Sequence, residues 1–77
     1  FTTLLYELSE NSHVKITIYD MLGREVKTLI NKTQDAGSRT VIWNATNDYG
    51  EPVSAGIYLY QIKAGEHLQT KKMVLLK

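Results

Sequence analysis

Strict alternation of apolar and polar residues limits how this chain can fold more than any other feature of its sequence. In the segment HVKITIYD, every second residue from Val14 to Ile18 is aliphatic, with Lys15 and Thr17 between them. Successive side chains of a β-strand point to opposite faces, so this period predicts a strand with one buried face. The segment TLLYEL has the same period. The predicted inward residues of these two strands are Leu4, Tyr6, Leu8, Val14, Ile16 and Ile18.

Later segments continue the β pattern and are separated by turns. SRTVIWN, IYLYQIK and LQTKKMVLLK are rich in β-prone residues and predict three further strands. EVKTLINK is less regular, because Val26 and Leu29 are three residues apart while Ile30 is in phase with Val26. A strand with a bulge and a single helical turn both fit this spacing, and we favour the bulged strand. Gly23 and Gly65 mark two of the turns.

Short strands with frequent turns and no helical pattern predict an all-β fold. We expect an immunoglobulin-like antiparallel β-sandwich of about six or seven short strands. The length of 77 residues predicts a single domain over 1–77. Trp43 is the only tryptophan, and we expect it to anchor the core. A domain of this size should have a free energy of unfolding of roughly 3–5 kcal/mol.

Composition excludes several classes of function. The chain has no cysteine, which excludes thiol catalysis, disulfides and cysteine-based zinc sites. Its net charge of +1 provides no strong field for nucleic acid or anionic membranes. We find no apolar run of the roughly 20 residues that a membrane span needs. The chain starts at Phe1 rather than methionine, so we expect it to be a piece of a longer protein.

Catalytic groups are scattered along the sequence. His13 and His67 both fall in predicted turns, where an exposed imidazole is the ordinary outcome. Ser12, His13 and Asp20 supply the residue types of a catalytic triad, but no nucleophile elbow or oxyanion loop accompanies them. No phosphate-binding glycine loop is present. We therefore expect no enzymatic activity, no small-molecule substrate and no cofactor.

The loop NATNDYG gathers oxygen-bearing side chains, including Asn44, Asn47 and Asp48. Calcium prefers six to eight oxygen ligands, usually with several carboxylates among them. Here Asp48 and Glu51 are the only charged candidates. Hydrogen bonds from nearby backbone amides to these side chains are the favoured interpretation, with calcium as the alternative, and we expect no metal site.

The segment KKMVLLK, residues 71–77, places four apolar residues between lysines. One interpretation puts this strand in the middle of a sheet, with Met73 and Leu75 inward and Val74 and Leu76 covered by neighbours. The lysines would then protect a sheet edge from pairing with other chains. The alternative is that this strand, or its exposed edge, is what a partner recognises.

Several segments together resemble a known family. YELSENSHVKITIYDMLGREVKTLI, AGSRTVIWNATNDYGEPVSAGIYLYQIKAGE and KKMVLLK occur in the order and spacing of the type A C-terminal sorting domain of the bacterial type IX secretion system. The pattern is also similar to the immunoglobulin-like domain of the flagellar hook-capping protein, which shares the tryptophan, glycine and GxY core. The resemblance covers essentially the whole chain.

The resemblance implies a non-catalytic targeting domain. Such a domain follows a larger covalently joined cargo protein, and it is recognised by a secretion translocon and commonly removed by a sortase-like peptidase. It would pass through the periplasm to the cell surface or the medium. Translocon recognition carries over to Lys71, Lys72, Met73, Val74, Leu75, Leu76 and Lys77. Structural roles carry over to Gly23, Trp43, Gly50, Gly56 and Tyr58.

A second hypothesis keeps the fold and changes the role. The domain would be a structural or assembly module of a surface protein, an extracellular polymer or a flagellar hook-cap-like protein. Its exposed sheet edges would then allow self-association. An upstream signal peptide and a large catalytic or adhesive region would favour targeting, whereas flagellar gene neighbours would favour assembly.

Overall fold

The computed structural model describes residues 2–76 and consists of strands, turns and loops. Strands occupy the segments that the alternation predicts. Their bounds are β1 Thr2–Leu8, β2 Ser12–Tyr19, β3 Glu25–Gln34, β4 Gly37–Trp43, β5 Gly56–Ala64 and β6 His67–Leu75. No helix in residues 2–76 has the length and apolar character to cross a membrane.

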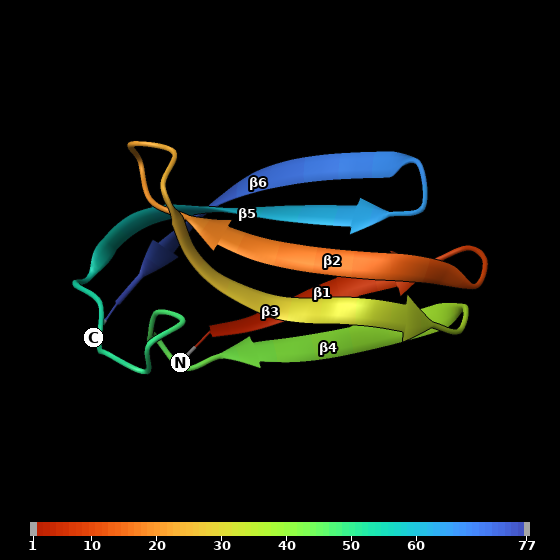
Figure 1. Cartoon of the computed structure of the whole chain (residues 1–77), viewed down its shortest axis with the longest axis horizontal. Coiled ribbons are helices and arrows are strands. Elements are labelled where there is room, and N and C mark those ends of the chain that lie inside the picture. The colour runs from red at the N-terminus through yellow and green to blue at the C-terminus, as the bar shows by residue number, and fades with distance from the viewer. Residues whose placement is uncertain (1, 77) are drawn as a thin grey trace.

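The strands form two antiparallel sheets. β1 pairs with β4, and the other four strands form a sheet in the order β3-β2-β5-β6. Figure 1 shows the four-stranded sheet with β1 passing behind β2 and β3. The turns after β1 and β3 carry the chain from one sheet to the other, so that the two sheets enclose a common core. The predicted all-β, immunoglobulin-like β-sandwich is confirmed, with six strands in residues 2–76.

The core lies between the two sheets and follows the predicted phases. Every predicted inward residue of β1 and β2 is buried, and Val14, Ile16, Ile18 and Trp43 have no exposed surface. Burying aliphatic side chains of this size contributes about 1.5–3 kcal/mol each, which drives the sheets together. The buried apolar residues are Leu4, Tyr6, Leu8, Val14, Ile16, Ile18, Trp43, Ala45, Tyr58, Ile62 and Leu75.

β3 contains two bulges opposite β2. Ile16 is opposite Ile30 but the next residue, Thr17, is opposite Thr28, so Leu29 is an extra residue on β3. A second register shift near the start of β3 makes Val26 extra as well. These bulges let Val26, Leu29 and Ile30 all pack against the core despite their mixed spacing. The predicted bulged strand is confirmed, and the helical-turn alternative is wrong.

One end of the sandwich is covered by loops, and we call it the loop-capped end. It comprises the turn 20–24 and the loop 44–55. Trp43 Nε1–H donates to the Thr46 carbonyl at 2.8 Å, and the Tyr58 hydroxyl donates to the Ser54 carbonyl at 2.6 Å. The two aromatic rings meet edge to face with their centroids 5.2 Å apart. The loop is thus held against the core by the aromatic side chains that it covers.

The opposite end, which we call the hairpin end, has only short turns at 9–11, 35–36 and 65–66. Asn11 Oδ1 accepts a hydrogen bond from the Ala36 amide at 2.8 Å, which links the two turns that cross between the sheets. Gly65 takes a positive φ of 60° in the two-residue loop between β5 and β6. A two-residue hairpin of this kind favours glycine for that reason, as the sequence predicts.

Candidate functional site

β6 is an edge strand. Within residues 2–76 it pairs on one side with β5 and has no strand on the other. The interpretation that places KKMVLLK in the middle of a sheet is therefore wrong. Leu75 is inward and 1% exposed, and Met73 packs against the core. Val74 and Leu76 are not covered, because β6 closes the core with one face and leaves the other in solvent, where they are 58% and 81% exposed. Lys77 lies outside the described residues.

The two consecutive lysines of β6 lie on opposite faces of the sheet. Lys71 is opposite Tyr60, whose side chain packs against the core, so Lys71 is on the inner face. Lys72 is opposite Leu59, which is on the outer face. Both lysines are exposed. A partner pairing with the free edge of β6 would therefore meet a positive charge on either side.

A groove runs along the inner flank of β6. It has a volume of ≈ 820 Å³ and lies between β6 and β1 at the side of the sandwich. Tyr6, Leu8 and Ile62 provide apolar surface, and Lys71 and Arg39 lie along its walls. The groove exists because a two-stranded sheet faces a four-stranded one and covers only part of it. An extended segment has room there beside an apolar floor.

Of the three glycines with expected structural roles, Gly23 and Gly50 lie in turns and Gly56 is the first residue of a strand. Gly23 has a φ of 83° and its amide donates to the Asp20 carbonyl at 3.0 Å. Gly50 has a φ of 78° and donates to the Asn47 carbonyl at the same distance. Such φ values are costly for a residue with a Cβ, which explains glycine at both positions. Gly56 begins β5 with a φ of 150°.

The candidate triad residues do not converge. Ser12 and His13 begin β2, whereas Asp20 follows its last residue, so the length of the strand separates them. The Ser12 hydroxyl donates to the Glu10 carbonyl, and His13 Nε2 lies 2.7 Å from Asn31 Oδ1. His13 and His67 are both exposed. The arrangement therefore contains no nucleophile next to a base, which triad chemistry requires.

Asp20 instead closes the turn between β2 and β3. Its Oδ1 accepts backbone hydrogen bonds from Leu22 and Arg24, both at 2.9 Å, and its Oδ2 is 2.8 Å from Arg24 Nε. The amide of Arg24, more than any other group, lowers the pKa of the Asp20 carboxyl, because its hydrogen bond favours the charged form. This carboxylate has a conformational role in the turn.

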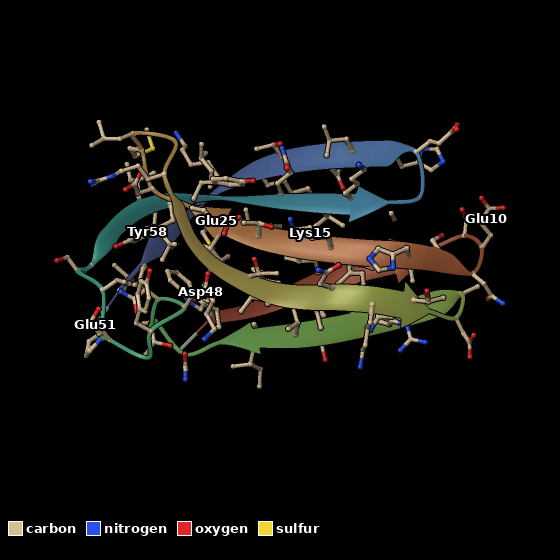
Figure 2. The ribbon with its side chains drawn as sticks, in the orientation of Figure 1. Glu10, Lys15, Glu25, Asp48, Glu51 and Tyr58 are labelled. Carbon is tan, nitrogen blue, oxygen red and sulfur yellow. The ribbon has the colours of Figure 1, made fainter. Side chains whose placement is uncertain are left out.

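Side-chain oxygens of the NATNDYG loop accept hydrogen bonds from backbone amides of the protein. Asn47 Oδ1 accepts from the amides of Tyr49 and Glu51 at 2.9 and 3.0 Å. Asp48 Oδ1 accepts from the Thr28 amide at 3.1 Å, which ties the loop to β3. In Figure 2 Asp48 and Glu51 lie apart, with Asp48 toward β3 and Glu51 at the outer part of the loop. The predicted capping role is confirmed, and residues 2–76 contain no group of three or more His, Asp or Glu that could hold a metal.

Together the fold and its surfaces define a small immunoglobulin-like sandwich with unpaired strand edges and a lateral groove. Residues 2–67 match the family described as FlgD Ig-like domain, and the chain belongs to that family. A search of curated proteins finds no match. The family match ends at His67, the first residue of β6, so the lysine-led part of β6 lies beyond the matched range.

Three features of the fold were not predicted from the sequence. The groove depends on how many strands each sheet has, which no local pattern encodes. Ala45 has a positive φ of 63° although it is not glycine, and alanine carries no sequence signal for that conformation. The position of β6 at the edge also required the pairing order of the strands.

Proposed function

We propose that this domain is a non-catalytic recognition module that directs a larger, covalently joined protein to the cell surface or the medium. The observation that carries the proposal is the free edge of β6, which presents Lys71, Lys72 and Val74 to solvent over a nine-residue strand. The proposed destination, and the proposed partners, a secretion translocon and a sortase-like peptidase, rest on the resemblance to type IX sorting domains. Passage through the periplasm is part of this proposal.

The physical basis is strand addition. An exposed strand edge offers a row of amide and carbonyl groups that a partner strand can pair with, and the side chains on the two faces provide specificity. Lys71 and Lys72 would contact the partner on the two faces of the sheet. The groove beside β1 gives the partner access to Lys71 from the inner side.

The test is export of a reporter protein fused to residues 1–77 in a bacterium with a type IX system. Deletion of 71–77 also removes buried Leu75, so loss of export in that variant would not separate recognition from unfolding. The double variant Lys71→Glu with Lys72→Glu keeps the core and reverses the edge charge. We expect it to remain in the periplasm while its unfolding transition stays near that of the wild type.

The control is Lys32→Glu, which reverses an exposed charge on β3, the other edge strand of the same sheet. We expect normal export of this variant. Export of the Lys71→Glu, Lys72→Glu protein at the wild-type level would refute the assignment of the signal to β6. Equal loss in both variants would show that net charge matters and the position does not.

A second candidate function is a structural module that assembles with copies of itself. The match to the FlgD Ig-like domain over residues 2–67 favours it, because that match covers the sandwich without most of β6. Edge-to-edge pairing through β3 or β6 would produce concentration-dependent association. Sedimentation equilibrium of residues 1–77 tests this directly. A monomer throughout the micromolar range would argue against assembly through these edges.

A further inference from the structure

The outer face of the four-stranded sheet is a second exposed surface, which lies apart from the groove and shares Lys72 and Val74 with the edge strand β6. Strand register places its side chains in rows that cross the sheet. Near the hairpin end, Lys15 on β2 is directly opposite Lys63 on β5. Toward the loop-capped end, Tyr19 is opposite Leu59, which is in turn opposite Lys72. Figure 2 shows Lys15 on this face near the middle of β2.

The two facing lysines are unfavourable for the isolated domain. Side chains directly opposite in an antiparallel pair have their Cβ atoms about 4.5–5.5 Å apart, and like charges at that separation destabilise the sheet. Both lysines are exposed, and within residues 2–76 the one ion pair is Arg24 with Asp20, elsewhere in the fold. The residues beside the lysines in the same row are Asn31 and Leu68, neither of which is anionic.

The other half of the face carries an apolar patch, with the exposed Glu25 and Lys72 at the two ends of the row that contains Tyr19 and Leu59. Ile57 and Val74 are opposite each other on β5 and β6, and they are 43% and 58% exposed. They lie next to the row that contains Tyr19 and Leu59, so the apolar side chains are contiguous across three strands. One surface therefore combines two facing lysines with an apolar patch that Glu25 and Lys72 flank.

We propose that the outer face of the four-stranded sheet binds an acidic protein surface that also presents apolar side chains. Carboxylates of the partner would lie against Lys15 and Lys63, and its apolar groups would cover Ile57 and Val74. Charge complementarity favours this partner over a second copy of the chain, because the rows of this face carry three lysines, Lys15, Lys63 and Lys72, and one carboxylate, Glu25. The proposal does not depend on whether β6 directs export.

The size of the outer face determines the affinity that we expect for the partner. The Cα positions extend over 35 × 21 × 21 Å, so one whole face is of the order of the ~800 Å² per partner of a standard stable interface, and a partner that covers part of it buries less. Complexes at the low end of this range are weak and transient. Because exposed lysines supply part of the attraction, affinity should fall as salt is raised.

The test titrates ¹⁵N-labelled residues 1–77 with a random copolymer of glutamate and tyrosine, and separately with polyglutamate. We expect amide shifts to concentrate on the outer-facing residues of β2, β5 and β6, with tighter binding of the copolymer. The double variant Lys15→Glu with Lys63→Glu should raise the dissociation constant about tenfold or more, as removal of interfacial charge pairs does. Lys71→Glu is the matched control, since it changes a neighbouring lysine on the opposite face of β6, and it should change the constant less than about twofold.

A second readout separates binding from folding. Lys63→Glu alone replaces a like-charge pair with an opposite-charge pair, so its urea midpoint should rise while its affinity falls. Amide shifts concentrated on β1 and on the inner-facing residues of β6, or equal losses in Lys71→Glu and the double variant, would overturn the proposal. Equal affinity for dextran sulfate would overturn it too, because that polyanion lacks apolar side chains. Binding to phosphatidylglycerol vesicles at the copolymer's affinity would assign the face to a lipid surface instead.

Discussion

The two ends of the sandwich are built from the same strands but are closed in different ways. At the loop-capped end, the loop 44–55 covers Trp43 and is bonded to β3 through Asp48. At the hairpin end, three short turns leave the side of the sandwich open, and the groove of ≈ 820 Å³ lies along β1 and β6. Closure of a small sandwich therefore depends on loops as well as on strands, and the end with the shorter connections is the one left accessible.

β6 runs from the hairpin end to the loop-capped end, and its burial differs between the two. Its residues from His67 to Lys72 are all exposed, whereas Leu75 is 1% exposed. The strand thus contributes to the core near the loop-capped end and is exposed toward the hairpin end, where the lysines of the proposed recognition edge begin. We expect substitutions to separate these contributions, and the following variants are ordered from the largest expected effect to the smallest.

Trp43→Ala should unfold the domain. Replacing a fully buried aromatic residue costs about 3–5 kcal/mol, which equals the whole stability expected of a domain this size. The substitution also removes the hydrogen bond to the Thr46 carbonyl. Far-ultraviolet circular dichroism measures the outcome without relying on the lost indole. A cooperative unfolding transition with a midpoint near that of the wild type would contradict the central role of this end.

Leu75→Ala and Leu68→Ala compare the two halves of β6 directly. Leu75→Ala should cost about 2–5 kcal/mol, because it leaves a cavity in the core. Leu68 is 60% exposed, so Leu68→Ala should change stability by no more than about 0.5 kcal/mol. Urea unfolding followed by fluorescence of Trp43 gives both values. Similar losses in the two variants would mean that the hairpin end is packed as tightly as the other.

Sequence periodicity predicted which face of each strand is buried, but it did not predict which strands pair with one another. Alternation assigned Leu4, Tyr6 and Leu8 to the core because the period of a strand is local. The bulge in β3 was favoured from the sequence, although a helical turn also fitted the mixed spacing of Val26, Leu29 and Ile30. Pairing of β1 with β4 joins residues that are between 29 (Leu8 with Gly37) and 41 (Thr2 with Trp43) positions apart, and the chain crosses between the sheets twice on the way. No local signal specifies such a partner.

The surfaces depend on that non-local information. An apolar segment such as 73–76 occurs both in the middle and at the edge of a sheet. Its composition alone therefore led to the wrong prediction that neighbouring strands cover Val74 and Leu76. Capping by Asn47 was predictable because an Asx side chain bonds the backbone a few residues away. The bond from the Thr28 amide to Asp48 was not, because it joins distant parts of the chain.

Tyr58→Phe and Tyr6→Phe test whether the hydrogen bonds of the two ends differ. Each hydroxyl donates at 2.6 Å, Tyr58 to the Ser54 carbonyl and Tyr6 to Gln34 Oε1. Tyr58→Phe should cost about 1 kcal/mol, because the fixed backbone carbonyl loses its donor. Tyr6→Phe should cost less, since the Gln34 side chain can turn toward water. The urea midpoints of the two variants test this expectation. A larger loss of stability for Tyr6→Phe would mean that the hairpin end, and not the loop-capped end, is the more rigid.

Asp20→Asn should have the smallest effect, and its dependence on pH identifies the cause. The hydrogen bond from the Arg24 amide lowers the pKa of Asp20 in the folded state, so this group stabilises the fold fully above its ordinary pKa of about 3.9. That stabilisation is lost as the pH falls through the lowered folded value. The difference between the urea midpoints of wild type and Asp20→Asn should therefore shrink from neutral pH to acid. Asp35→Asn, at the hairpin end, is the control for removing one negative charge. A difference for Asp20→Asn that stays constant with pH would show that its carboxylate charge does not stabilise the turn at the loop-capped end.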